Sequence, residues 1–170
     1  MRHAFLRPLL FLAAALTLSG CGIYSFTGTS IQNDVNTIHI EYFEYKAQKV
    51  NPTLSNDLTE ELRTRFRRMT RLQEVEQDAD LEITGEVTGY NITAAAITAD
   101  EIAARNRLTV TVRVNFTNRK YPEDDFDGKT FTAFAEFNSD LDFNSVESTL
   151  CSEIIEKLIE DIFNATVAQW

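Results

Sequence analysis

Alternation of apolar and polar residues predicts four β-strands in the middle of the chain. The strongest pattern occupies residues 108–117, where aliphatic or aromatic residues alternate with threonine, arginine and asparagine. Weaker versions of the pattern occupy residues 37–43, 81–90 and 131–137. Because successive side chains of a strand point to opposite faces, these strands predict a sheet with one apolar face and one threonine-rich polar face.

The first predicted strand, residues 37–43, carries the only histidine outside the first few residues. Its alternation places Tyr42 on the same face as Ile38 and Ile40, with His39 on the opposite face. A single histidine without neighbouring cysteines, histidines or paired carboxylates does not make a metal site. We therefore expect His39 to be an exposed strand residue.

Apolar residues at intervals of three and four predict two helices. The first opens at Asn51, an N-cap followed by proline at the first helical position, and continues to about Thr70. The second opens at Asn144, with Glu147 placed for a capping box, and runs nearly to the end of the sequence. Each helix has a single apolar face, made of Leu54, Leu58, Leu62, Phe66 and Met69 in the first and of Val146, Leu150, Ile154, Leu158 and Ile162 in the second.

The predicted order is strand, helix, three strands, helix. A strand–helix–strand start implies a right-handed crossover and a parallel pair, while the later strands are joined as antiparallel hairpins. Since both helices and the sheet have one apolar face each, the economical fold is α+β: a two-layer sandwich with two helices on one face of a mixed four-stranded sheet. We expect residues 36–170 to form this single domain, with the polar face of the sheet open to water or to a polar partner.

The first 20 residues have the layout of a secretory signal peptide. Two arginines precede an apolar stretch at residues 9–18, which is too short to span a bilayer as a helix. The order Leu18-Ser19-Gly20-Cys21 resembles a bacterial lipobox, which implies cleavage before Cys21 and acylation of that cysteine, with palmitate among the chains. The alternative is an ordinary signal peptide followed by a chance cysteine.

Residues 21–35 are predicted to be a lipidated tether. Small polar residues favour an extended segment, although Ile23, Tyr24 and Phe26 could pack back onto the domain. Buried acyl chains contribute about 0.8 kcal/mol per methylene, so two or more chains make a stable membrane anchor.

The charge of the chain limits its partners. The formal charge is −10, and it becomes about −12 once the two leader arginines are removed, which leaves 14 basic against 26 acidic residues. Such an acidic protein is not expected to bind nucleic acid or an anionic lipid surface through its overall charge. Attachment to a membrane must then come from the acyl chains.

The densest positive charge lies on the first predicted helix. Five arginines fall within nine residues: Arg63, Arg65, Arg67, Arg68 and Arg71. A solvated helix face is the commoner explanation of such a run. The functional interpretation is an anion contact, to a lipid phosphate or to acidic groups of a protein partner. Arg63, Arg67 and Arg71, at helical spacing, are the candidates.

Catalytic and metal chemistry find little support in the sequence. If Cys21 is acylated, Cys151 has no partner for a disulfide, and its place in an apolar helix face predicts a small buried hydrophobe. The carboxylates of residues 123–127 lack the spacing of a calcium loop, which favours a solvated turn. No Ser/His/Asp set and no Gly-rich phosphate loop is present. We therefore expect a protein that is not an enzyme and that carries no cofactor or metal.

Several segments together resemble the LptE family of lipopolysaccharide-assembly lipoproteins. They are residues 22–31 directly after the lipobox, Asn51-Pro52-Thr53-Leu54-Ser55, residues 59–66, Gly85-Glu86-Val87-Thr88-Gly89-Tyr90, residues 106–110 and residues 161–170. The resemblance implies a two-helix, mixed-sheet outer-membrane lipoprotein that plugs the lumen of the LptD β-barrel and assists delivery of lipopolysaccharide. It implies contact with lipopolysaccharide, but the basic residues proposed for this role in other members have no matching positions here.

The sequence leaves two points of this interpretation open. Both the open sheet face and the helix ends are candidates for the surface that enters the barrel. A periplasm-facing lipoprotein scaffold or binding module with a different envelope partner is the alternative function. Residues 22–26 also lack the acidic run that follows the lipidated cysteine in surface-displayed lipoproteins of some bacteria, and the comparison with those proteins implies a lipid anchor in the periplasm-facing leaflet.

Overall fold

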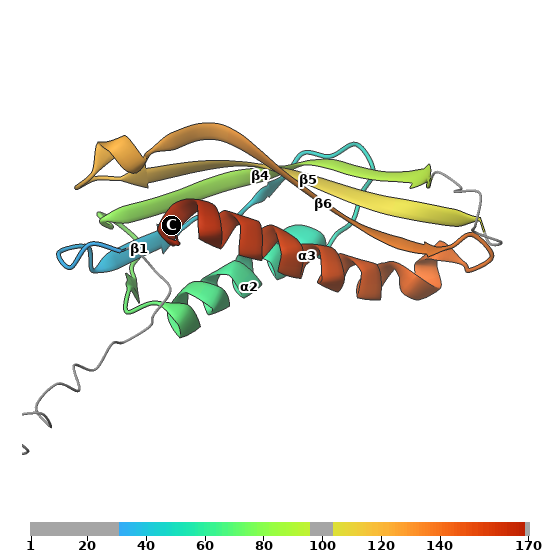
Figure 1. The fold of residues 1–170 in the computed structure, drawn as a ribbon, viewed down its shortest axis with the longest axis horizontal. Coiled ribbons are helices and arrows are strands. Elements are labelled where there is room, and N and C mark those ends of the chain that lie inside the picture. Colours follow the sequence, from blue (N-terminus) through green and yellow to red (C-terminus); the bar gives the residue numbers. More distant parts are fainter. Residues whose placement is uncertain (1–30, 96–103, 169–170) are drawn as a thin grey trace, which may run out of the picture.

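Two helices, α2 (Leu54–Met69) and α3 (Phe143–Val167), lie against one face of a long twisted sheet (Figure 1). The structure is a computed structural model that describes residues 31–95 and 104–168. The signal peptide, Cys21 and the first part of the predicted tether therefore lie outside the described residues. The α+β class and the placement of both helices on one side of a mixed sheet are confirmed.

Among the described residues the sheet has six strands, so the predicted number of four is wrong. In spatial order they are β3 (Gln73–Glu74), β1 (Thr37–Ile40), β4 (Leu81–Ala94), β5 (Arg105–Asn118) and β6 (Phe126–Asn138), and β2 (Glu44–Tyr45) also pairs with β4. The two additional strands, β2 and β3, have two residues each. A strand of two residues has no alternation to detect, and only its neighbours in space define it.

The directions of the strands follow the predicted topology. The pairings of β1 with β4, β1 with β3 and β2 with β4 are parallel, with α2 in the crossover between β1 and β4. The long strands β4, β5 and β6 are antiparallel neighbours. A short 3-10 helix, η1 (Pro122–Asp124), forms the turn between β5 and β6.

The first strand ends earlier than the alternation predicts. The predicted strand residues Tyr42 and Phe43 follow its end, and each faces the side opposite to the one predicted. β1 stops at Ile40; Phe43 is then fully buried, whereas Tyr42 is 51% exposed. The Phe43 amide donates to Thr59 Oγ1 of α2 (3.1 Å), and its ring lies where a side chain on Gly85 of β4 would stand. Between β1 and β2 the chain leaves the ladder of pairings with β4. At this break the alternation shifts, so Tyr42 and Phe43 point to the faces opposite to those predicted.

Both helices begin close to the predicted positions but with different caps. The first helical residue of α2 is Leu54, and Thr53 is its N-cap without a side-chain bond. Asn51 still contributes, because its Oδ1 accepts hydrogen bonds from the Thr53 and Leu54 amides (3.1 and 3.0 Å). α3 begins at Phe143, and no capping box forms at its start.

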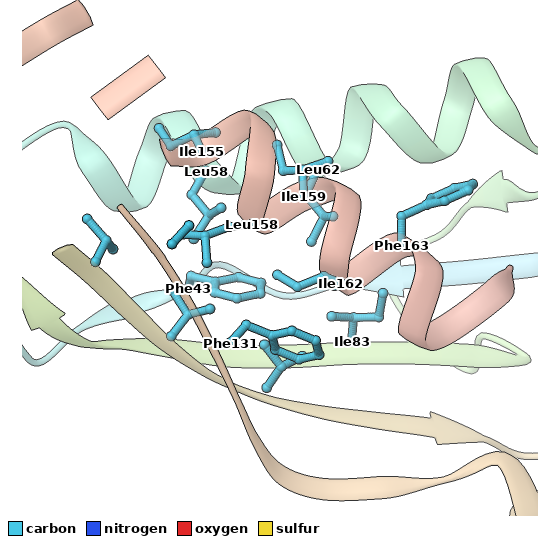
Figure 2. Packing of buried hydrophobic residues seen from close by; sticks show 14 of the residues in the cluster. Phe43, Leu58, Leu62, Ile83, Phe131, Ile155, Leu158, Ile159, Ile162 and Phe163 are labelled. Atoms are coloured by element: carbon cyan, nitrogen blue, oxygen red, sulfur yellow. The ribbon is translucent and has the colours of Figure 1, made fainter. Parts of the chain in front are cut away.

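The core lies between the helices and the inner face of the sheet (Figure 2). It is formed by the predicted apolar faces, including Leu58, Leu62, Val110, Val112, Val114, Ile154, Leu158 and Ile162, all fully buried. Burial of each such side chain contributes about 1.5–3 kcal/mol. Met69 is an exception to the predicted α2 face, since it lies at the helix end and is 47% exposed.

The two helices run in the same direction along the sheet. Near their C-terminal ends the rings of Phe66 and Phe163 pack edge to face with centroids 5.0 Å apart, a favourable aromatic geometry. Near their N-terminal ends Asp57 of α2 and Ser148 of α3 line one shallow groove. With both helices on the inner face, the outer face of the sheet is left uncovered by the described residues (Figure 1).

Candidate interaction surface

The outer side of the long strands carries the polar half of the predicted alternation. We call this surface the open face and define it by Thr84, Glu86, Thr109, Thr111, Arg113, Asn115, Thr117, Thr130 and Thr132, all of which are exposed or half-buried. Cross-strand pairs hold it together: Thr111 Oγ1 lies 3.2 Å from Thr132 Oγ1, and Asn115 Nδ2 donates to Thr84 Oγ1 (3.1 Å). The predicted threonine-rich face is therefore confirmed.

Charged side chains on the open face are paired across three strands. Lys46, directly after β2, contacts Glu86 of β4 (2.7 Å) and Glu44 (2.9 Å), and Arg113 of β5 contacts the other oxygen of Glu86 (3.1 Å). The hydrogen bond from Lys46, together with the charges of Lys46 and Arg113, lowers the pKa of Glu86. The same two carboxylates raise the pKa of Lys46. This part of the face is charged but locally close to neutral.

A hollow of about 580 Å³ lies in the open face beside this ion-pair group. The exposed ring of Tyr42 and the carboxylates of Glu41 and Asp127 line it, together with Asn115 and Gly128. Gly128 has a positive φ of 64°, and its amide donates to Asn115 Oδ1 (2.7 Å), which fixes the strand irregularity at this rim. The hollow is wide and polar, and suits another protein surface better than a small apolar ligand.

The three candidate arginines have different surroundings. Arg63 bonds to the carbonyl of Ile40 (2.7 Å) and pairs with Glu60 (2.8 Å) and Glu74 (3.0 Å). It thereby ties α2 to the strands β1 and β3. Its guanidinium is already largely occupied by groups of the protein.

The other two candidates lie nearer to solvent. Arg71 follows the end of α2 and donates to the carbonyls of Gln32 (2.5 Å) and Val35 (3.3 Å), so it fastens the segment before β1. Arg67 is exposed, and its one hydrogen bond within the described residues goes to Thr64 (3.1 Å) on the preceding turn. Arg67 is therefore the candidate with most of its guanidinium free for a partner.

The structure shows a polar cluster near the start of both helices that the sequence analysis does not predict. The Tyr90 hydroxyl donates to Glu147 Oε1, which also accepts from Asn51 Nδ2 (3.0 Å). Cys151 Sγ lies 3.7 Å from both the Tyr90 hydroxyl and Asn51 Nδ2. Burial, and then the hydrogen bond to Glu147, raises the pKa of Tyr90; burial likewise raises the pKa of Cys151, which keeps its thiol protonated.

This cluster connects three elements that are distant in the sequence. Asn51 precedes α2, Tyr90 lies on β4, and Glu147 and Cys151 lie on α3. Lys49 adds a contact to the Phe143 ring, 4.5 Å from its centroid. No local signal marks such a set, and Glu147 is at the position where a capping box is expected. The prediction of a capping role is wrong because the Glu147 carboxylate faces Tyr90 instead.

The described residues contain no candidate metal site. Within residues 31–95 and 104–168, no three His, Cys, Asp or Glu side chains are grouped so that they could hold a metal ion. His39 is half-buried, and its Nδ1 lies 3.0 Å from the carbonyl oxygen of Val75. No helix in this part of the chain is both long and apolar enough to cross a bilayer.

Comparison with known protein families gives a match over most of the chain. A family model described as LptE, lipopolysaccharide-assembly, matches residues 35–166. No curated protein sequence is significantly similar to the chain.

Two solved structures with TM-scores above 0.5 share this fold at low sequence identity, and a third structure is less similar. The hypothetical protein CT253 from Chlamydia trachomatis has a TM-score of 0.51 and 10% identity, over 77% of this chain and 97% of that one. A homologue of the neuraminyllactose-binding hemagglutinin from Helicobacter pylori has a TM-score of 0.52 and 11% identity, over 82% and 87%. A minor lipoprotein from Acinetobacter baumannii reaches a TM-score of 0.46 and 17% identity, over 75% and 89%.

Proposed function

The chain belongs to the LptE family of lipopolysaccharide-assembly proteins, and on this basis we propose that it is a non-catalytic outer-membrane lipoprotein that occupies the lumen of an LptD-like barrel and assists lipopolysaccharide assembly. Its family membership supports the role in lipopolysaccharide assembly. The partner, the surface used and the lipid anchor are parts of the proposal.

The observation that carries the plug function is the character of the open face. Three long strands present a threonine-rich surface whose charges at Lys46, Glu86 and Arg113 are paired among themselves. The inner wall of a large membrane barrel is polar, so a plug must present a polar surface that stays hydrated or forms hydrogen bonds there. Threonine hydroxyls and paired charges meet this requirement at a lower desolvation cost than isolated charges would. We therefore assign the open face, rather than the helix ends, to the barrel wall.

The anchor in this proposal is Cys21, acylated at the mature N-terminus. The net negative charge of the chain argues against attachment to anionic lipids through charge, so in this proposal the acyl chains provide the attachment. Residues 22–30 then link the membrane to Ile31, where the described domain begins.

We assign lipopolysaccharide contact to Arg63 and Arg67 of α2 and to Arg71, which lies two residues after the end of the helix. Phosphate groups bind guanidinium groups through paired, charge-assisted hydrogen bonds. Arg63 and Arg71 each hold part of the fold, whereas Arg67 is more available. In this proposal Arg67 makes the principal contact and Arg71 adds positive potential beside it, whereas the charge of Arg63 is offset by Glu60 and Glu74.

Co-purification tests the proposal. Tagged protein is extracted from outer membranes in mild detergent, and a variant with Thr111→Glu and Thr132→Glu is compared with a control carrying Glu156→Arg on the solvent side of α3. We expect a large outer-membrane barrel to accompany the wild type and the control, and to be lost from the double variant. Recovery of the lipoprotein alone from all three preparations would instead favour a scaffold with another envelope partner.

A further inference from the structure

The positive charge at the end of α2 differs from most of the other positive charge of the domain. Most described lysines and arginines contact a carboxylate, as Arg113 does with Glu86 (3.1 Å). Within residues 31–95 and 104–168, no carboxylate lies within 4.0 Å of the side-chain nitrogens of Arg67, Arg68 or Arg71. The hydrogen bonds of Arg67 and Arg71 go to neutral oxygens, which do not compensate their charge.

These arginines surround the C-terminal end of α2. Arg67 and Arg68 lie in its last turn, and Arg71 follows two residues after it; all three are exposed. Met69 lies between them with a 47% exposed side chain. We call these four residues the arginine end. The negative end of the helix dipole offsets part of the repulsion among the charges, but most of their N–H donors have no acceptor in the described part of the chain.

The chain enters the described domain beside the arginine end. Arg71 donates to the carbonyls of Gln32 (2.5 Å) and Val35 (3.3 Å), and the description begins at Ile31. The ten residues from Cys21 to Ser30 can span at most about 35 Å. If Cys21 is acylated as proposed, the arginine end therefore remains close to the membrane. The opposite end of the domain lies farther away, because α3 alone extends for about 37 Å along it (Figure 1).

We propose that the arginine end contacts the phosphate groups of the membrane that holds the lipid anchor, and that this contact orients the domain. The proposal rests on the acylation of Cys21 and does not require the barrel. Guanidinium groups form paired, charge-assisted hydrogen bonds with phosphate. The exposed apolar side chain of Met69 among them suits the boundary between headgroups and acyl chains.

The anchor makes a small basic surface sufficient for this role. A few arginines would not hold a free protein with a formal charge of −10 on anionic lipids. The anchor already keeps the domain near the membrane, so the contact has only to favour one orientation over others. The attraction falls off over a Debye length of about 10 Å at 0.1 M salt, so it acts on the charges nearest the surface.

Acidic residues near the same segment determine which side turns toward the membrane. Asp124 of the η1 turn accepts a hydrogen bond from Gln32 Nε2 (3.2 Å), and Asp34 accepts one from the Tyr121 hydroxyl (2.9 Å). The segment before β1 therefore connects the arginine end, in the helix layer, to an acidic turn of the sheet. Anionic headgroups attract the first and repel the second. The N-terminal ends of both helices then point away from the membrane.

Fluorescence quenching on the full mature lipoprotein tests the contact. The protein is reconstituted in vesicles of phosphatidylethanolamine and phosphatidylglycerol that contain a phospholipid with a nitroxide on its headgroup. A fluorophore is attached at Met69→Cys or, in a second sample, at Leu141→Cys, which is similarly exposed (45%) and lies just before α3. Cys151 is buried, and the Cys21 sulfur carries an acyl chain in this proposal, so the introduced cysteine takes the label.

A charge variant separates the arginines from the effect of the anchor. It carries Arg67→Gln and Arg68→Gln, and it keeps Arg71 because that residue fastens the segment before β1. The matched control carries Lys49→Gln and Lys129→Gln. These changes remove the same charge from two positions outside the arginine end, and in the described domain both lysines contact aromatic rings rather than carboxylates.

We expect the Met69 label to be quenched at least about threefold more than the Leu141 label in the wild type and in the lysine control. In the arginine variant this difference should largely disappear. Equal quenching at the two positions in the wild type would overturn the proposal, and so would a difference that the arginine variant retains.

Mass spectrometry of the purified protein distinguishes this inference from the proposed anchor. Absence of the acyl chains would overturn the anchor and this contact with it, whereas acylated protein without the expected difference would overturn the contact alone. Phosphates of phospholipids and of lipopolysaccharide offer a guanidinium the same hydrogen bonds. The vesicles therefore contain neither lipopolysaccharide nor barrel, and the plug function keeps its own test.

Discussion

Tyr90 on β4 donates a hydrogen bond to Glu147 on the first turns of α3, and the tyrosine is only 2% exposed. The bond joins the sheet to the helix that covers it. Asn51 binds the same carboxylate oxygen from the loop before α2, so the starts of both helices are fixed to one strand.

Removal of the Tyr90 hydroxyl is therefore expected to destabilise the domain. Tyr90→Phe keeps the ring but leaves Glu147 with one partner fewer, and we expect a loss of about 1–2 kcal/mol in the free energy of unfolding. Denaturant titration measures it. Tyr42→Phe is the matched control, since Tyr42 is 51% exposed, and it should change stability by less than about 0.5 kcal/mol. Equal effects of the two substitutions would contradict the role given to the cluster.

Gly85 is expected to tolerate no side chain while Phe43 is present. A methyl group at this position would overlap the Phe43 ring, so Gly85→Ala should cost about 1–3 kcal/mol of stability. Combining Gly85→Ala with Phe43→Leu should cost less than the sum of the two single changes. Strict additivity in a double-mutant cycle, measured by thermal or chemical unfolding, would show that the two residues do not compete for the same space.

Asp80 should make the domain sensitive to acid. Its carboxylate accepts the amides of Asn36 (2.7 Å) and Thr37 (3.1 Å) and contacts Lys120 (3.2 Å). The backbone hydrogen bond from Asn36, followed by the contact with Lys120, lowers its pKa from the ordinary value of 3.8. A lowered folded-state pKa gives stability that is fully present above 3.8 and is lost as the pH falls through the folded value.

Measurement of the free energy of unfolding of the wild type and of Asp80→Asn as a function of pH tests this prediction. Asp78→Asn is the control, because the side chain of Asp78 is 94% exposed. At pH 7 the Asp80 variant should be less stable than the wild type by about 1 kcal/mol. This difference should shrink as the pH falls below about 4, because Asp80 is then protonated in the unfolded chain before it is protonated in the folded domain. A difference that stays constant from pH 7 to pH 3 would exclude the proposed electrostatic contribution.

Substitution of Arg63 should affect mainly the stability of the domain, whereas substitution of Arg67 should affect mainly lipopolysaccharide binding. Arg63→Ala removes bonds to β1 and β3 and should lower the free energy of unfolding by about 1–2 kcal/mol. Arg67→Ala should leave stability nearly unchanged and weaken lipopolysaccharide binding several-fold, measured by binding to immobilised lipopolysaccharide. Unchanged binding by a folded Arg67→Ala variant would remove this residue from the proposed contact.

The parts of the fold that the sequence predicts correctly are those with long, regular patterns. Ten residues of strict alternation identify β5, and its inner residues Val110 and Val112 are fully buried. The helical repeat from Leu54 to Phe66 identifies α2 and its buried face in the same way. In such segments burial and local geometry favour the same conformation, so the pattern is sufficient.

The errors occur where distant contacts override the local pattern. Tyr42 and Phe43 exchange faces because Gly85, on another strand, leaves space for the Phe43 ring. β2 and β3 exist only through pairing with strands formed elsewhere in the chain. Glu147 is bound by a tyrosine 57 positions away, so its capping-box spacing is coincidental.

The candidate surface was predictable in character but not in detail. The threonines of the open face follow directly from alternation, whereas the hollow at Tyr42 depends on the break between β1 and β2. The arginine cluster was visible in the sequence, but only the three-dimensional contacts separate Arg63, which holds strands, from Arg67, which does not.

Site-specific photocrosslinking in intact cells tests the central claim most directly. A photoreactive residue replaces Thr111 at the centre of the open face, and a matched variant carries it at Glu156 on the solvent side of α3. If the open face meets the barrel wall, Thr111 should give a crosslink to a large outer-membrane barrel, and Glu156 should give a much weaker one or none. A barrel crosslink from Glu156 with none from Thr111 would show that the helices enter the barrel and would contradict this assignment.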